Sequence, residues 1–263
     1  MLTTDFVAGS PNWIDLGSPD TGASATFYTS LFGWEYQSAG PDSGGYGFFT
    51  LDGKSVGAVG PLTEEGAHSS WTVYFDTADA NDTAKAVEAG GGSVRVPPTD
   101  VFSEGRMAAF TDPTGADFAV WQPGDTKGLG AVTSVNTLAW TELYTSDAAV
   151  AKRFYADVFG WVATDNDMGG GMIYTTVKPA TGGDTADQGG VMQISPEMAA
   201  AGLTPRWGIY FEVADCDATV AKAVELGGTV LMGPETMENV GRLAQMLDPH
   251  GASFAVIASA MPS

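Results

Sequence analysis

Apolar side chains recur along the chain with two spacings, which distinguish the predicted helices from the predicted strands. Phe27 and Leu31 lie four residues apart, as on one face of a helix, and Gly33 follows where a left-handed helix end favours glycine. Short stretches rich in β-branched and aromatic residues, bounded by glycine-rich turns, predict strands instead. In chain order we expect a strand at 11–17, a helix from 19 to 32, and strands at 34–37, 45–51 and 54–60.

The same order of elements then follows a second time. After a polar loop we expect a strand at 71–75, a helix at 79–89, and strands around Val94, at 106–110 and at 117–121. The last two strands are joined by Asp112-Pro113-Thr114-Gly115, whose proline and glycine positions are typical of a type I turn. This half of the chain therefore contains two β-α-β-β-β units.

The second half of the chain repeats the first. The segment FYTSLFGW at 27–34 returns as FYADVFGW at 154–161, and Gly160 stands where Gly33 stood. Three more segments recur in the same order: 13–16 as 140–143, 71–76 as 207–212, and 105–115 as 241–251. Repeats of this length are too large for solenoid units and indicate duplicated modules. We therefore predict a first module at 1–122, a linker at 123–134 and a second module at 135–263.

The number of residues between a segment and its repeat is larger for the later segments than for the earlier ones. This growth predicts an insertion between Met168 and Gln193, where residues 181–185 are typical of a longer hairpin loop.

Composition excludes several classes of function. The formal net charge is −21, from 32 acidic and 11 basic residues, and no nucleic-acid partner is expected because phosphate binding needs clustered Lys and Arg. No apolar run is long enough to span a membrane, and residues 1–12 contain no signal-peptide pattern. Together with a single cysteine, Cys216, these features predict a cytoplasmic protein. The acids on either side of Cys216 should raise the pKa of its thiol, so we interpret it as a structural residue.

Four motifs in this order, present twice, carry a family resemblance. They are the paired β-α-β-β-β units, the helix ending in FYxxxFGW, the W-x-x-Y-F-[DE] strand and the final D-P-x-G-x-x-F-A-V hairpin. The chain resembles the vicinal oxygen chelate superfamily, the group of glyoxalases, bleomycin resistance proteins and extradiol dioxygenases. It is similar within that group to tandem actinobacterial proteins labelled hydroxylase or glyoxalase-like. The resemblance implies an α+β fold of four βαβββ units in two tandem modules, with mixed, open, barrel-like sheets.

The resemblance also points to positions for a metal. Members of the superfamily usually hold a divalent ion through a His or Gln on the first strand, a His on the first strand of the second unit, and a Glu on the final strand. In this chain the corresponding positions of the two modules are Trp13, Thr72, Ala119, Trp140, Gly208 and Ala255. None of these side chains is a ligand for a first-row metal.

The histidine count leads to the same expectation. The chain has two histidines, His68 in a predicted loop and His250 in a predicted turn, which cannot supply two imidazoles to one module. We therefore predict no metal and no cofactor. A weak magnesium or calcium site made of oxygen ligands remains the alternative.

The sheet faces at the expected metal positions remain as candidate ligand sites. Strand alternation places Asp15 on the face of Trp13, and Glu142 and Tyr144 on the face of Trp140. An aromatic floor with one carboxylate suits a flat, conjugated or cationic small molecule. We predict ligand binding by Trp13, Thr72, Tyr74, Trp140, Tyr144 and Tyr210. The alternative is that these residues are sheet core, which we expect for Trp71 and Trp207 beneath the helices.

Asp15 and Glu142 are the candidate catalytic residues. Each lies between apolar neighbours on a strand expected to be central, where a carboxylate is costly unless it is bonded or functional. Either could act as a general base. The alternative is a buried hydrogen bond to a backbone amide or a tyrosine hydroxyl.

Three functions are consistent with these features. The first is a protein that binds a small aromatic or cationic metabolite or natural product without a metal. The second is a metal-independent enzyme, of hydroxylase, lyase or isomerase type, acting on a carbonyl or polyketide-like substrate. The third is an interaction scaffold. The expected partner is a small molecule, and the fusion of two modules in one chain favours a monomer.

Overall fold

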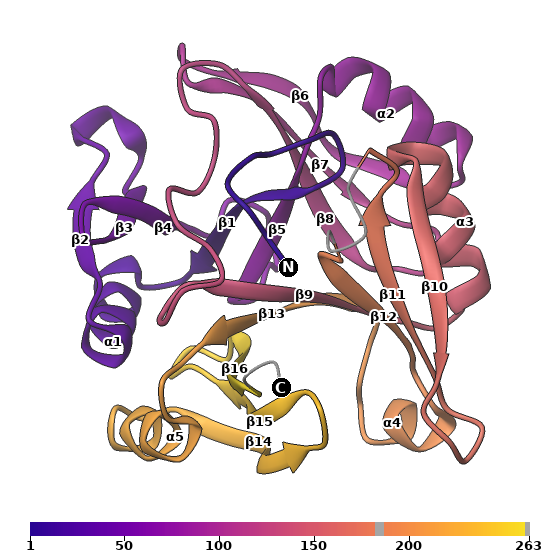
Figure 1. Cartoon of the computed structure of the whole chain (residues 1–263). Coiled ribbons are helices and arrows are strands. Elements are labelled where there is room, and N and C mark those ends of the chain that lie inside the picture. Colours follow the sequence, from indigo (N-terminus) through magenta and orange to yellow (C-terminus); the bar gives the residue numbers. More distant parts are fainter. Residues whose placement is uncertain (182–186, 261–263) are drawn as a thin grey trace. The chain divides into compact units, whose positions relative to one another are not determined.

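The computed structural model describes residues 1–181 and 187–260 (Figure 1). Most of the predicted hairpin loop at 181–185 lies outside the described residues. The elements of the first half are β1 (Pro11–Ser18), α1 (Thr21–Phe32), β2 (Glu35–Ser38), η1 (Pro41–Ser43), β3 (Gly47–Leu51), β4 (Lys54–Pro61), β5 (Ser70–Asp76), α2 (Ala80–Ala89), β6 (Ser93–Val101), β7 (Gly105–Thr111) and β8 (Asp117–Pro123).

The second half has the same order of elements with one addition. Its elements are β9 (Leu138–Thr145), α3 (Ala148–Phe159), β10 (Trp161–Asp167), β11 (Ile173–Pro179), β12 (Gly189–Gln193), α4 (Pro196–Ala200), β13 (Arg206–Glu212), α5 (Cys216–Glu225), β14 (Thr229–Met237), β15 (Gly241–Leu247) and β16 (Ser253–Ser259). The four predicted β-α-β-β-β units are confirmed. The sequence analysis did not predict the short elements η1 and α4.

The strands form two mixed sheets of eight strands each, as the predicted fold class requires. Their orders are β2-β3-β4-β1-β5-β8-β7-β6 and β10-β11-β12-β9-β13-β16-β15-β14. The first strand of a unit pairs in parallel with the last strand of that unit, and the intervening strands are antiparallel. In this register Asp15 lies opposite Ala58, and Glu142 lies opposite Gly190.

Aspartate side chains cap the starts of the long helices, and glycines end two of these helices. An aspartate precedes each of α1, α2, α3 and α5 and accepts hydrogen bonds from amides of the first turn. The helices α1 and α3 end at Gly33 (φ 72°) and Gly160 (φ 68°), both in the left-handed conformation. The predicted glycine helix ends are therefore confirmed.

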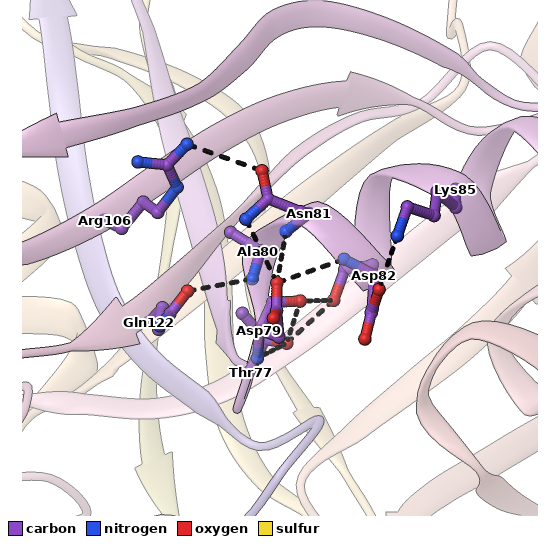
Figure 2. Close-up of polar contacts among 9 residues, drawn as sticks. Thr77, Asp79, Ala80, Asn81, Asp82, Lys85, Arg106 and Gln122 are labelled. Carbon is purple, nitrogen blue, oxygen red and sulfur yellow. Dashed lines mark hydrogen bonds and ion pairs between the residues drawn. The ribbon is translucent and has the colours of Figure 1, made fainter.

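Figure 2 shows how the start of α2 is tied to the neighbouring strands. Asp79 accepts hydrogen bonds from the amides of Asn81 at 2.7 Å and Asp82 at 3.2 Å. The first helical amide donates to Gln122 Oε1 on β8 at 3.0 Å, and Arg106 Nη2 on β7 donates to Asn81 Oδ1 at 3.4 Å. The backbone hydrogen bonds also lower the pKa of Asp79, because they favour its charged form.

The chain packs into two compact units, and each unit contains segments of both halves of the sequence. Unit 1 comprises Met1–Trp13, Val73–Gly128 and Trp140–Gly208, and unit 2 comprises Ile14–Thr72, Leu129–Ala139 and Ile209–Ser263. Within unit 1, α2 of the first half and α3 of the second half lie side by side (Figure 1). Within unit 2, α1 and α5 are in contact. The module boundaries predicted from the repeats stay a prediction.

A buried tyrosine joins the two halves in each unit. In unit 1, Trp207 Nε1 donates to the Tyr155 hydroxyl at 2.9 Å, and that hydroxyl donates to Asp112 Oδ2 at 3.0 Å. In unit 2, Trp71 Nε1 donates to Tyr28 at 2.9 Å. Tyr28 in turn donates at 3.2 Å to Asp248, the counterpart of Asp112.

These contacts place both indoles against helix residues. The rings of Trp71 and Tyr28 meet edge to face at 5.2 Å, and those of Trp207 and Tyr155 do so at 5.5 Å. The predicted packing of Trp71 and Trp207 beneath the helices is confirmed. In the described part of the chain, no helix is long and apolar enough to cross a membrane.

Candidate functional site

The candidate site that the structure defines most fully lies in unit 1, on the face of β9 that carries Glu142. Alternation along β9 places Trp140, Glu142 and Tyr144 on one side of the strand. Glu142 is buried, with 4% of its surface exposed, and Tyr144 is equally buried. The sequence analysis predicted these three residues as one group.

A tyrosine that the sequence analysis missed completes this face. Tyr174 on β11 receives a hydrogen bond from Trp140 Nε1 at 2.9 Å and hydrogen bonds to the Glu142 carboxylate. A glycine makes room for it, because a Cβ at Gly190 on β12 would lie 2.0 Å from the Tyr174 hydroxyl oxygen. The three side chains form a hydrogen-bond chain from indole to phenol to carboxylate.

The electrostatics of the face keep Tyr174 as a neutral donor. Burial raises the pKa of the Tyr174 hydroxyl, and the nearby Glu142 charge raises it further. Tyr174 is therefore protonated at neutral pH and can donate to the carboxylate. Tyr174 is therefore the hydrogen-bond partner that the non-catalytic interpretation of Glu142 requires. A role of Glu142 as general base stays a prediction.

Arg206 lies at the other end of the same face. Its guanidinium carbon is 5.1 Å from the centre of the Tyr144 ring, within the range of a cation–π contact. Gly208 follows two residues later on β13, and a Cβ there would lie 3.3 Å from Tyr144 Cε2. Arg206 and Gly208 thus share the side of β13 that faces Tyr144. The sequence analysis assigned no role to Arg206.

Unit 2 contains the counterpart of the acid–tyrosine pair. The Tyr46 hydroxyl donates to Asp15 Oδ2 at 3.0 Å. A glycine again lies under the ring, because a Cβ at Gly60 would be 2.7 Å from Tyr46 Cδ2. The Phe48 ring lies 5.7 Å from the Tyr46 ring, edge to face. Both halves therefore place a tyrosine against the acid of their first strand.

The remaining predicted ligand residues are divided between the two units. Trp13 and Tyr74 belong to unit 1 and are buried, whereas Thr72 and Tyr210 belong to unit 2. The Tyr210 hydroxyl accepts a hydrogen bond from Gln245 Nε2 at 3.4 Å. The structure thus brings together Trp140, Glu142 and Tyr144, and ligand binding by all six residues stays a prediction.

The paired tyrosines could have been found by aligning the two halves more closely. Each lies at the start of the second strand after the helix, Tyr46 just before β3 and Tyr174 as the second residue of β11. A change of spacing in the preceding loop, which is longer in the second half, conceals the match in the sequence.

Metal ligands among the described residues would be acidic, histidine or cysteine side chains. Among residues 1–181 and 187–260, no group of three or more His, Cys, Asp or Glu side chains could hold one. His68 is exposed, and His250 lies in a turn where its amide donates to Asp248 Oδ1 at 2.9 Å.

Both halves of the chain match one family model. This model, described as the glyoxalase/bleomycin resistance protein/dioxygenase superfamily, covers residues 10–120 and again 137–256.

Similar proteins span nearly the whole chain. The anthracycline biosynthesis protein DnrV of Streptomyces peucetius is 42% identical, over 97% of this chain and 94% of that protein. CFP32 of Mycobacterium bovis, which is named as a glyoxylase, is 38% identical, over 97% of this chain and 96% of that protein.

Solved structures share the fold at low identity. The 2,2',3-trihydroxybiphenyl 1,2-dioxygenase of Sphingomonas wittichii superposes with a TM-score of 0.66 at 15% identity, over 96% of this chain and 91% of that chain. The Mn(II)-bound glyoxalase of Novosphingobium aromaticivorans superposes with a TM-score of 0.61 at 17% identity, over 95% of this chain and 82% of that chain.

Proposed function

Because the chain belongs to the glyoxalase/bleomycin resistance protein/dioxygenase superfamily, we propose that it binds a small planar aromatic natural product on the face of β9 around Glu142. The observation that carries this proposal is the grouping of Trp140, Tyr144 and Tyr174 around one buried carboxylate. Aromatic side chains offer a large, rigid contact area to a flat ligand, and a single charged group fixes its orientation.

The relatives support an aromatic ligand. DnrV, which matches this chain almost from end to end, is named for anthracycline biosynthesis, and anthracyclines are planar fused-ring compounds. A cationic ligand, the other class expected from the sequence, has less support on this face because Arg206 already lies against the Tyr144 ring. A cytoplasmic location and a small-molecule partner are parts of the same proposal.

Equilibrium titration of the purified full chain with 2-(hydroxymethyl)anthraquinone, a neutral planar probe, tests the proposal. We expect saturable binding by the wild type and an affinity about tenfold weaker in Trp140→Ala, since losing one stacking partner costs about 1.4 kcal/mol. Phe102→Ala is the matched control, because the Phe102 ring is 81% exposed in unit 1 and belongs to no predicted site. An undetectable affinity in the wild type, or equal affinities in all three proteins, would contradict the proposal.

The second candidate function is metal-independent proton transfer, and a specific observation favours it. Glu142 is buried and held by a neutral tyrosine, so its carboxylate is oriented within an apolar face as a general base would be. Asp15 with Tyr46 repeats the arrangement in unit 2. In the proposed step, the carboxylate removes a proton from the carbon α to a ligand carbonyl and leaves an enolate. The carbon then regains a proton from the resulting carboxylic acid or from solvent.

Deuterium exchange separates this activity from binding alone. NMR of 1-tetralone in D2O, with and without protein, measures exchange at the carbon next to its carbonyl. We expect Glu142→Gln to remove the protein-dependent exchange at unit 1, and Asp15→Asn to remove that at unit 2, while the melting temperatures stay near the wild-type value. Full exchange activity in both variants removes the proposed general base, and no exchange in the wild type leaves binding as the function.

A further inference from the structure

Over the part of the chain that the structure describes, Arg206 differs from the other half-buried arginines, Arg106 and Arg242, in having no acidic partner. Arg95, Arg106 and Arg242 each form an ion pair with an aspartate. Among the residues that the structure describes, the Arg206 guanidinium makes neither a hydrogen bond nor an ion pair, and its Nε atom is buried. In a chain with 32 acidic residues against 11 basic ones, this is an unusual environment for an arginine.

Among the described residues, the Arg206 guanidinium is held in place by the ring of Tyr144. The Tyr144 ring, itself 4% exposed, lies 5.1 Å from the guanidinium carbon. Stacking on a buried ring restricts the arginine side chain without consuming any of its N–H donors. The donors are therefore oriented in advance for an acceptor that none of the described residues provides.

The first half of the chain lacks both members of this pair. By the repeat, the position of Arg206 corresponds to Ser70, and the position of Tyr144 corresponds to Gly17. These two are also neighbours in unit 2, because a Cβ at Gly17 would lie 3.8 Å from the Ser70 carbonyl oxygen. The arginine and its supporting ring are thus present together in one half and absent together in the other.

We propose that Arg206 determines the specificity of the Glu142 face, by binding an anionic oxygen substituent, such as a carboxylate or phenolate, on the aromatic ligand. This inference rests on the proposed function. A guanidinium offers paired N–H donors that match the two oxygens of a carboxylate. The Glu142 carboxylate repels the same substituent, so the two charges on one face give the ligand a single preferred orientation.

Two probes that differ in one substituent, a charged carboxylate in one and a neutral carboxamide in the other, test the inference. Anthraquinone-2-carboxylate and anthraquinone-2-carboxamide have the same ring system, and we expect the wild type to bind the carboxylate at least tenfold more tightly. Arg206→Gln should abolish this preference while it leaves carboxamide affinity within about twofold, because only the charged hydrogen bonds are lost. Tyr144→Leu should reduce the preference, since the guanidinium then loses its support.

Arg153→Gln is the matched control, because Arg153 is an exposed arginine of the same unit. It removes the same charge and should keep the full preference. A preference that persists in Arg206→Gln, or equal binding of both probes by the wild type, overturns the role of Arg206 while the proposed aromatic site stands. Failure of both probes to bind the folded wild type overturns the proposed function and the inference with it.

Discussion

At the residue scale, the most consequential polar groups are the two tyrosines that the helices bury in the aromatic core. Tyr28 and Tyr155 are fully buried, and each accepts from an indole N–H and donates to an aspartate. Burial raises the pKa of both hydroxyls well above the ordinary value, and the neighbouring aspartates raise it further. A buried polar group that keeps all its partners stabilises the core, whereas one that loses a partner costs about 1–3 kcal/mol.

We expect these tyrosines to make the fold sensitive to alkaline pH. An unfolded tyrosine ionises near pH 10, but the folded pKa is higher, so ionisation favours the unfolded chain. The free energy of unfolding should therefore be constant through this contribution below about pH 10 and fall as pH rises above it. Urea denaturation between pH 8 and pH 11 measures the effect.

Tyr155→Phe separates the hydroxyl from the ring. At pH 7 it should lower the free energy of unfolding by about 1–3 kcal/mol, because Trp207 and Asp112 both lose a buried partner. Above pH 10 its stability should fall less steeply than that of the wild type. Tyr36→Phe is the control, since Tyr36 is 41% exposed. The same slope in Tyr155→Phe and wild type would contradict a raised pKa of Tyr155 in the folded chain.

The pKa shift of the Cys216 thiol was predicted from its neighbours in the sequence alone. The thiol is buried, and its pKa is raised by burial first and by Asp217 second. The direction of the shift, predicted from the acidic neighbours, is confirmed, although burial is the larger cause. That cause depends on where α5 packs, which the local sequence does not state.

At the scale of elements, local signals located the helices and strands within a few residues. The predicted helix at 19–32 is α1 (Thr21–Phe32), with Asp20 as its cap, and the predicted strand at 71–75 is β5 (Ser70–Asp76). The short helix α4 was missed because its five residues are too few to show a period.

The glycine that ends α1 gives a test at this scale. Gly33 has φ 72°, and a Cβ there would meet no atom within 4 Å, so the cost of Gly33→Ala is that of the backbone conformation alone. We expect a loss of about 1 kcal/mol in the free energy of unfolding. Gly22→Ala within the same helix is the control and should be neutral or stabilising, because alanine favours helix and Gly22 has no positive φ. Equal effects of the two substitutions would refute this explanation.

At the scale of the whole molecule, the repeat in the sequence and the packing of the chain divide the protein differently. Each compact unit takes one β-α-β-β-β unit from each half. In unit 1, Phe118 of the first half packs against Phe154 and Tyr155 of the second at 6.0 and 5.5 Å between ring centres. In unit 2, Tyr28 contacts Phe254 at 5.6 Å. Neither half therefore contains all the side chains that cover its own aromatic core.

Dividing the chain in the predicted linker tests this mutual dependence. We expect residues 1–134 and residues 135–263, expressed separately, to lack cooperative urea unfolding and to bind a hydrophobic dye, because the rings around Tyr28 and Tyr155 would be exposed. Co-expression of the two pieces should restore a complex that unfolds cooperatively. If either piece alone unfolded with the stability of the full chain, the halves would be independent domains.

The sequence by itself determined the elements, their order and the duplication, because these depend on signals carried by neighbouring residues: apolar period, caps, glycine helix ends and turn residues. It also grouped Trp140, Glu142 and Tyr144, because alternation along one strand is a local rule. Only the tertiary structure decided which side chains of different strands are in contact. These pairs are Tyr174 with Glu142, Tyr46 with Asp15, and Arg206 with Tyr144. Those contacts join different strands, and their partners depend on the register between strands and on glycines such as Gly190 that leave room for a ring.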